Sequence, residues 1–291
     1  MSDRIERDSM GEVRVPVDAM YGAQTQRAID NFGLRERTLP VAFIRSLAMI
    51  KSAAASANLD CGVLDAAIAL ALKDAARRVL EGEFDDQFPV SIFQTGSGTS
   101  SNMNMNEVLA RVASEASGQS VHPNDHANCS QSSNDVIPTC IQVTAMRALC
   151  HVLLPALESL IDTLASRGQQ LASVTKTGRT HLMDAMPLTF GQELGAWAAQ
   201  LKDCRQRFID LQARLRQLPI GGSAVGTGVN VPVGFTERLL PELNALTELS
   251  FVVAPDAFSR MAGQDVALEC SACLRALAVS LGKINNDLRW M

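Results

Sequence analysis

Aromatic residues are scarce in this sequence: phenylalanine, tryptophan and tyrosine make up 4% of its 291 residues, and there is a single tyrosine. Aromatic and β-branched side chains are the ones that a pleated sheet selects, so their scarcity argues against an all-β fold. Hydrophobic residues nevertheless form 47% of the chain, which is enough to build a sizeable core and excludes a disordered protein. The composition therefore predicts a mostly helical globular protein.

The chain also lacks an excess of positive charge. Lysine and arginine number 26 against 31 acidic residues, and the two signs are interspersed. Because no basic stripe is present to hold a phosphate backbone, we do not expect a nucleic acid partner. The N-terminal residues MSDRIERDSMGE contain no apolar leader, and we see no run of about 18 apolar residues that would span a membrane. The odd number of cysteines, seven, suits a reducing compartment, so we expect a cytoplasmic protein without a membrane partner.

Beyond Pro138 the pattern changes to long helices. The strongest case runs from Leu194 to Leu218, where apolar residues recur at alternating spacings of three and four. Such a repeat requires a partner helix crossing at about 20°. Segments at 139–168 and 270–291 carry similar apolar stripes, and each of the three helices could exceed about 35 Å. We expect them to share one core and to leave apolar surface for other subunits.

Two residues of the segment at 139–168 carry separate expectations. Pro155 predicts a kink, because proline cannot donate a backbone hydrogen bond within a helix. His151 lies in the middle of the same segment, and we expect it to be a core or interface residue.

Shorter elements are predicted before Pro138. Residues 1–40 look irregular, residues 41–82 predict two antiparallel helices joined near 58–62, and a further helix is expected at roughly 107–116. The predicted fold is all-α, with an N-terminal helical domain over residues 1–137 and a long-helix bundle over residues 138–291.

The polar stretch Gln94–Asn102 is the first that could carry chemistry. It can be interpreted as an ordinary loop whose Asn and Ser residues cap the next helix. Alternatively, Gly96 and Gly98 let backbone N–H groups turn toward one point. The hydroxyls of Ser97 and Thr99 and the positive end of the helix would then complete a cradle for an oxyanion. The spacing matches neither a nucleotide-binding P-loop nor a dinucleotide fingerprint, which favours a carboxylate as the guest.

A second polar stretch runs from His122 to Asp135. As an ordinary loop, it would use Asn134 or Asp135 to cap the helix that follows. Pro123 keeps His122 and His126 out of one regular helix, and no third ligand stands at a familiar spacing, so we predict no metal site.

The third and fourth stretches lie farther along the chain. Lys176–Pro187 contains Thr180 and His181, and imidazole is the natural proton carrier near pH 7. A lone histidine is usually structural, but this one directly precedes the strongest helical repeat. Gly221–Gly228 is a glycine-rich turn between helices with some potential to bind an anion.

These motifs together resemble class II fumarase. The resemblance rests on five segments: Thr95–Asn104, His122–His126, Gln131–Asp135, Gly178–Leu182 and Gly221–Gly228. Near the start of the chain, Asp8–Glu12 and Tyr21–Arg27 fit the same family, so the resemblance covers essentially the whole chain. In the wider fumarase/aspartase superfamily, the aspartase branch typically has Gln in place of His181 and Thr in place of Ser133. These two positions favour water over ammonia as the molecule added.

The resemblance implies a lyase of the tricarboxylic acid cycle that reversibly hydrates fumarate to (S)-malate. It implies a homotetramer whose active sites each draw on three subunits, with neither cofactor nor metal. His181 would be the catalytic residue that activates water or carries its proton, and Thr180 would contact the substrate. The implied carboxylate-binding residues are Ser97, Gly98, Thr99, Ser132, Ser133 and Asn134. A secondary dicarboxylate site of the family, to which we assign no chemistry, corresponds to His122, Pro123, Asn124 and Asp125.

The chain also departs from the family pattern. The family's mobile serine loop, its remaining bundle helices and its C-terminal domain come after the point where this sequence stops, and Gln119 stands where some members have arginine. We therefore expect an incomplete bundle, no C-terminal domain and negligible fumarate turnover by residues 1–291 alone. Two alternatives remain: a non-catalytic dicarboxylate-binding or assembly partner, and an aspartate ammonia-lyase.

Overall fold

The computed structural model describes residues 3–33 and 37–290, which form two compact units. The first unit comprises residues up to 144 together with residues 216–264, and the second comprises residues 145–215 and 265–291. The boundary expected at residue 138 lies inside helix α5 (Ser133–Ala148). Residues 216–264 return to the first unit, which a division by chain position alone does not anticipate.

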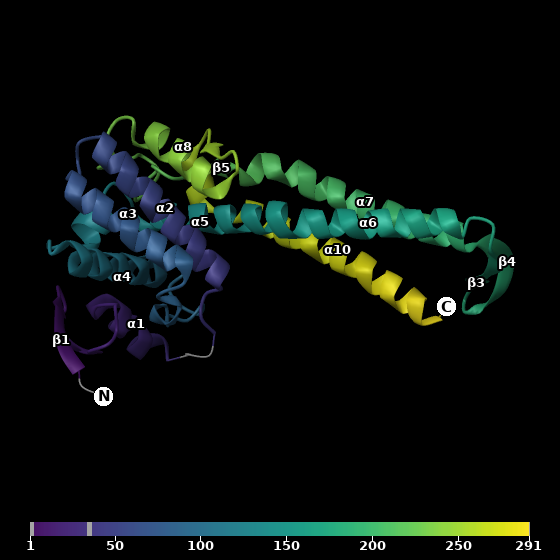
Figure 1. The fold of residues 1–291 in the computed structure, drawn as a ribbon, viewed down its shortest axis with the longest axis horizontal. Helices are drawn as coiled ribbons and strands as arrows, with labels where there is room; N and C mark the ends of the chain where they lie inside the picture. Colours follow the sequence, from purple (N-terminus) through teal and green to yellow (C-terminus); the bar gives the residue numbers. More distant parts are fainter. Residues whose placement is uncertain (1–2, 34–36, 291) are drawn as a thin grey trace. The chain divides into compact units, whose positions relative to one another are not determined.

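The first unit is built mainly from helices. Besides α5 these are α1 (Ala23–Phe32), α2 (Val41–Asp60), α3 (Ala66–Glu81), α4 (Thr99–Ser117), α8 (Phe235–Thr247) and α9 (Ala257–Ala262). A 3-10 turn (Asp85–Gln87), a π-helical turn (Pro123–Ala127) and a parallel pair of two-residue strands, β5 (Gln217–Leu218) and β6 (Val252–Val253), complete it. Helix α2 packs against α3, α4 and α8 (Figure 1), and the two helices predicted over residues 41–82 are confirmed.

Two expectations for the first unit are wrong. Residues 3–16 are not irregular but form an antiparallel hairpin of β1 (Asp3–Asp8) and β2 (Gly11–Pro16), in which Asp8 pairs with Gly11. Helix α4 begins at Thr99 rather than near residue 107. Its first turns have weak helical propensity, but Asn102 and Asn104 are buried there and hydrogen-bonded to other segments. These tertiary hydrogen bonds override the local preference.

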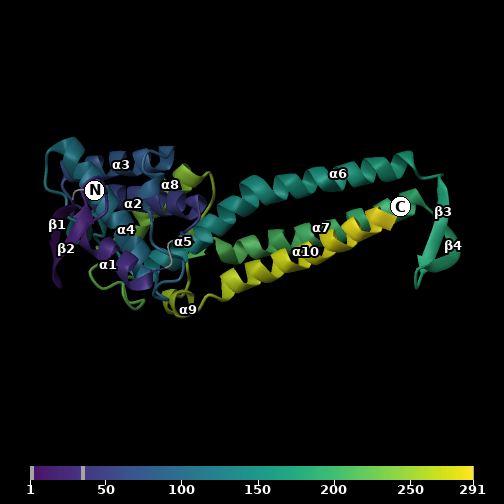
Figure 2. The same cartoon turned by 90° about the horizontal axis from the view of Figure 1, so that it is seen from below.

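The second unit consists of long helices and one hairpin. The helices are α6 (Leu154–Gln170), α7 (Phe190–Leu215) and α10 (Asp265–Trp290), and the hairpin joins β3 (Thr175–Thr180) to β4 (Met183–Thr189). Helix α7 packs against both α6 and α10 (Figures 1 and 2). The predicted 3.5-residue repeat is confirmed as the buried face of α7, which consists of Leu194, Trp197, Leu201, Cys204, Phe208, Leu211 and Leu215. Leu218 is also buried but belongs to β5.

A π-helical turn, Leu149–Leu153, directly precedes α6, which has Pro155 in its first turn, while the kink itself stays a prediction. Proline has no N–H to donate, so the regular hydrogen-bond ladder is interrupted at this point. His151 lies in this turn and is exposed in the single chain, which excludes the core position, while the interface position stays a prediction. Free cysteines also occur in this unit, including Cys270 and Cys273 on α10.

One helical stretch, Ser133–Gln170, is long and apolar enough to cross a membrane by length and composition, with a mean hydropathy of 1.5 in its most apolar window. This differs from the absence expected from the sequence. Core helices of soluble proteins meet the same criterion. Val136 and Val143 in the first half of the stretch are fully buried in the first unit, which is how a core helix packs.

Candidate active site

The start of α4 carries the first group of predicted site residues. Gly98 precedes the helix with φ 66°, a left-handed conformation that glycine adopts without strain. The Ser97 and Thr99 hydroxyls lie 3.0 Å apart on either side of it. The Gln94 side-chain oxygen accepts the Ser101 backbone N–H at 3.1 Å and so satisfies one of the free donors of the first turn. The remaining donors and the helix dipole favour negative charge here.

Helix α5 begins directly beside α4. A Cβ atom at Gly98 would lie 2.9 Å from Cγ2 of Ile137, so only glycine permits this approach. Asn102 of α4 also donates from Nδ2 to the Ser133 hydroxyl at 3.0 Å. The structure thus brings Ser97, Gly98 and Thr99 together with the Ser132–Asn134 segment, from a part of the chain about 35 residues away.

Asp135 ties the start of α5 to the Gly221–Gly228 loop. Its Oδ1 accepts the backbone N–H of Ser132 at 2.9 Å, and its Oδ2 accepts those of Gly221 and Ser223 at 3.0 and 2.9 Å. Asn134 donates from Nδ2 to the Ala224 carbonyl at 2.8 Å. The anion-binding potential foreseen for this loop is therefore used by a carboxylate of the protein itself.

A cleft of about 500 Å³ lies between these segments in the first unit. Ser97 and Asn134 form a polar edge, and Ile141, Val225 and Phe258 belong to its apolar lining. A small diacid presents this combination of charged ends and an apolar middle. The arrangement can bind a carboxylate through hydroxyls, an amide side chain and two helix N-termini.

Two buried ionisable groups lie near the start of α5. Burial raises the pKa of Asp135 to about 6, against the opposing effect of its three backbone hydrogen bonds and of the Lys51 charge. Burial lowers the pKa of Lys51 to about 7, and the charge of Asp135 opposes that shift. Sequence reasoning missed Lys51. The available signal was a single cation inside the apolar run Leu47–Ala57.

Thr180 and His181 lie in the second unit, at the tip of the β3–β4 hairpin. Thr180 pairs with Met183, so His181 and Leu182 form a two-residue turn with φ of 51° and 62°. Both values are left-handed, as a two-residue hairpin turn of this type requires. His181 is exposed, with its imidazole at the end of the hairpin. Since these two residues belong to the other unit, the structure does not join them to the cleft.

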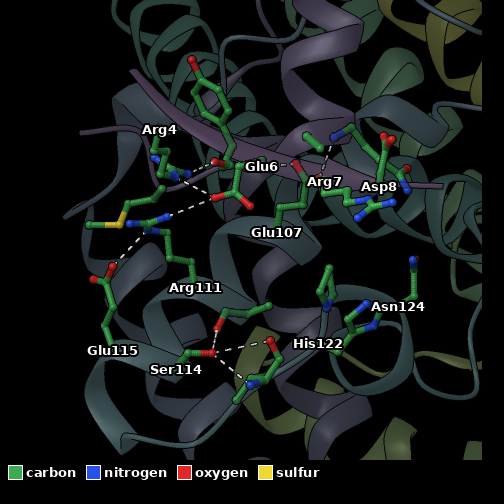
Figure 3. A pocket seen from close by; sticks show the side chains of 18 of the residues that line it. Arg4, Glu6, Arg7, Asp8, Glu107, Arg111, Ser114, Glu115, His122 and Asn124 are labelled. Atoms are coloured by element: carbon green, nitrogen blue, oxygen red, sulfur yellow. Dashed lines mark hydrogen bonds and ion pairs between the residues drawn. The ribbon is translucent and has the colours of Figure 1, made fainter. Parts of the chain in front are cut away.

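The residues expected at the secondary site form a compact turn. His122 caps the π-helical turn by accepting the Asp125 N–H through Nδ1 at 3.2 Å, and its own N–H donates to Nδ1 of His126 at 2.9 Å. His122, Pro123 and Asn124 line a pocket of about 570 Å³ together with residues of β1 and α4 (Figure 3).

The charged side chains of this pocket are mostly paired with one another. Arg4 donates to Glu6 and to four backbone carbonyls. Arg111 pairs with Glu6 and Glu115 (Figure 3). Glu107 accepts four hydrogen bonds from the start of α1. The mixed, self-neutralised charge gives the pocket little net attraction for an anion. Among the described residues, no group of three or more His, Cys, Asp or Glu is arranged to hold a metal ion.

Comparison with known proteins places the chain in a family. The sequence model of the Lyase family matches residues 11–291. The chain is 52% identical to a class II fumarate hydratase of Xylella fastidiosa, over 99% of this chain and 61% of that protein. It is 50% identical to the protein named fumarate hydratase class II 2 of Pseudomonas aeruginosa, over 99% of this chain and 63% of that protein. The solved class II fumarase of Schistosoma mansoni superposes with a TM-score of 0.94 at 38% identity, covering 98% of this chain and 64% of that one.

These matches place the chain in the fumarase/aspartase superfamily of helical proteins. The chain belongs to the Lyase family, and the relatives it matches are class II fumarate hydratases. It spans less than two thirds of the length of these relatives. The predicted all-α fold and the family resemblance are confirmed.

Proposed function

We propose that this chain carries the carboxylate-binding part of a fumarate hydratase that interconverts fumarate and (S)-malate. One observation carries the proposal: the N-termini of α4 and α5 lie in contact through Gly98 and Ile137, and Ser97 and Asn134 line one cleft between them. The Thr99 hydroxyl lies 3.0 Å from that of Ser97. Two helix N-termini and neutral donors at one point suit a carboxylate better than a neutral ligand.

The chemistry requires stabilisation of developing negative charge. In the direction of hydration, the oxygen of water bonds to one alkene carbon and a proton bonds to the other. In reverse, removal of the proton next to a carboxylate moves charge onto its oxygens and gives an aci-carboxylate dianion. Fixed N–H and hydroxyl donors bind that dianion more strongly than the ground state, so they lower the barrier. The proposed donors are Ser97, Thr99, Ser132, Ser133 and Asn134, with the N–H groups that follow Gly98.

His181 is the proposed group that handles the added water or its proton. An imidazole can accept and release a proton near neutral pH. Its place at an exposed hairpin tip suits a side chain that is presented to a cleft of another protomer. We therefore propose a cytoplasmic homotetramer with shared active sites, in which Thr180 contacts the substrate.

Two other functions compete with this one. His181 and Ser133 favour water over ammonia, which argues against an aspartate ammonia-lyase. A non-catalytic dicarboxylate-binding or assembly partner would use the same cleft without turnover. Because we expect negligible turnover by residues 1–291 alone, fumarate absorbance is followed in a protein completed to the length of the matched relatives, with and without ammonia, and this assay separates all three. Consumption in water alone supports hydration, an ammonia requirement supports the lyase, and binding without consumption supports the third.

Hydroxyl deletions test the proposed site. In the completed protein, we expect Thr99→Ala and Ser133→Ala each to lower kcat about 100-fold, equivalent to about 3 kcal/mol of barrier, with a smaller change in KM. Thr163→Ala on α6 removes a hydroxyl that bonds only its own helix, so it should leave kcat unchanged. Where turnover is too slow to follow, equilibrium binding of malate gives the same comparison. Equal malate affinity and turnover in all three variants would contradict the assignment.

A further inference from the structure

Lys51 is the one lysine of the described residues that the protein buries almost completely. It lies on α2 and is 3% exposed. Its ammonium donates to Oδ1 of Asn128 and to Oε1 of Gln131, both at 3.0 Å. No carboxylate oxygen in the described ranges lies within ion-pair distance of it. A buried ammonium held by neutral oxygens alone is costly, so its position calls for an explanation beyond stability.

Both acceptors belong to the turn that leads into α5. Gln131 donates from Nε2 to the Cys129 carbonyl at 3.0 Å, and Asn128 donates from Nδ2 to the Gln131 carbonyl at 3.2 Å. Asn58, two helical turns after Lys51 on the same face of α2, donates to the same Cys129 carbonyl at 3.0 Å. Helix α2 thus holds the turn at Asn128–Gln131 through two side chains.

The same network reaches a residue of the candidate active site. Asn102 on α4 donates from Nδ2 to Oδ1 of Asn128 at 3.1 Å and to the Ser133 hydroxyl at 3.0 Å. Three hydrogen bonds therefore connect the Lys51 ammonium to the Ser133 hydroxyl.

We propose that Lys51 is a positioning residue of the carboxylate-binding cleft, whose buried ammonium fixes the Asn128–Asn134 segment and supplies positive charge beside the start of α5. The inference rests on the function proposed above for this cleft. Lys51 does not touch the substrate. It acts through Asn128 and Asn102 on Ser133, and through its charge on the anion.

The protonation of Lys51 should change when an anion binds nearby. Because the pKa of Lys51 is lowered to about 7, the ammonium is only partly protonated at neutral pH. The ionisable groups that act on it are Asp135 and Cys140, both on α5. On α3 and α8, which also pack against α2, Lys73 pairs with Glu242 at 2.8 Å. A dicarboxylate bound nearby favours the charged form, so its binding should raise the pKa of Lys51 and take up a proton.

The test compares Lys51→Met, which keeps the length of the side chain without its charge, with Lys73→Met. Lys73 also faces α2, where it donates to the Ser56 hydroxyl, but it has no link to the cleft. Malate binding is measured by titration calorimetry between about pH 6 and pH 9, in buffers of different ionisation enthalpy, which reports proton uptake. Near pH 6, we expect Lys51→Met to bind malate about tenfold more weakly than the unaltered protein and to lose the proton uptake. Lys73→Met should match the unaltered protein in both measurements.

Two further measurements keep the inference falsifiable. Lys51→Arg retains the charge at every pH, so it should restore most of the affinity without proton uptake. Amide exchange over Asn128–Asn134 should be faster in Lys51→Met and unchanged in Lys73→Met. Unchanged affinity, proton uptake and exchange in Lys51→Met would overturn the role of Lys51. Failure of the unaltered protein to bind malate would instead overturn the proposed function, while the exchange data would still decide whether Lys51 holds the turn.

Discussion

Helices α2 and α10 are both rich in apolar residues, but they are buried to very different extents. Fourteen of the 20 residues of α2 are buried, including Lys51 and Asn58, whereas α10 buries three of its 26: Val266, Leu277 and Ile284. Leu274, Leu281 and Leu288 form a second stripe on α10 that is 37–52% exposed. Helix α2 is therefore covered largely by other segments of the first unit. The second unit presents apolar helix surface, which other copies would cover in the tetramer we propose.

Asp135→Ala should destabilise the first unit most. The substitution leaves the N–H groups of Ser132, Gly221 and Ser223 without their acceptor in a buried site. We expect a loss of about 4 kcal/mol in the free energy of unfolding, measured by denaturant titration. Asp184→Ala, at a side chain that is 84% exposed, should change it by less than about 0.5 kcal/mol. Similar losses at both positions would remove the contrast between buried and exposed carboxylates.

Leu281→Glu should act on the second unit without unfolding it. A charge in the exposed stripe of α10 opposes burial against another copy, so we expect self-association to weaken about 100-fold in sedimentation experiments. Arg275→Glu changes an exposed residue away from the stripe and should leave the assembly intact. An unchanged oligomer in Leu281→Glu would mean that the stripe faces solvent.

Two glycine substitutions measure the contact between α4 and α5. Gly98 and Gly118 cap the two ends of α4 with φ of 66° and 69°, but only at Gly98 would a Cβ meet another side chain. We expect Gly118→Ala to cost about 1 kcal/mol from strain alone, and Gly98→Ala about 2 kcal/mol because Ile137 must also move. Thermal unfolding of both variants gives the difference. Equal losses would show that the helix starts are not in firm contact.

The pH dependence of the free energy of unfolding tests the lowered pKa of Lys51 in the first unit. Between its folded pKa of about 7 and its unfolded value near 10.5, Lys51 is neutral when folded and charged when unfolded. The unfolded state then binds more protons, so stability rises with pH. Relative to Lys51→Met, the unaltered protein should gain about 1 kcal/mol per pH unit over this window, and the gain should vanish below pH 7. Denaturant titrations at several pH values check the slope, and a constant difference would show that Lys51 keeps an ordinary pKa.

Periodicity predicted the parts of the fold in which side-chain pattern and burial coincide. The repeat from Leu194 onward is the buried face of α7 because α6 and α10 pack along it. The hairpins were not predicted, since β1 and β3 consist largely of charged and hydroxyl residues without a clear apolar alternation. The early start of α4 was missed because buried hydrogen bonds, rather than propensity, stabilise its first turns.

The sequence pointed to several residues near the cleft but not to the buried side chains that hold these residues in place. Ser97, Thr99 and Asn134 stand in recognisable polar motifs, so the sequence pointed to them directly. Lys51 was not foreseen because its role depends on which turn α2 packs against, and no local pattern encodes that contact. Asp135 was expected only as a helix cap, while its bonds to Gly221 and Ser223 join segments more than 80 residues apart.

The tip of the β3–β4 hairpin has a practical consequence for engineering. His181 and Leu182 hold left-handed backbone angles that asparagine followed by glycine adopts with less strain. The double replacement H181N/L182G should therefore raise the melting temperature, and it would discard the imidazole at the same time. A screen that ranks variants only by melting temperature would therefore select this replacement and enrich proteins that lack the proposed proton carrier.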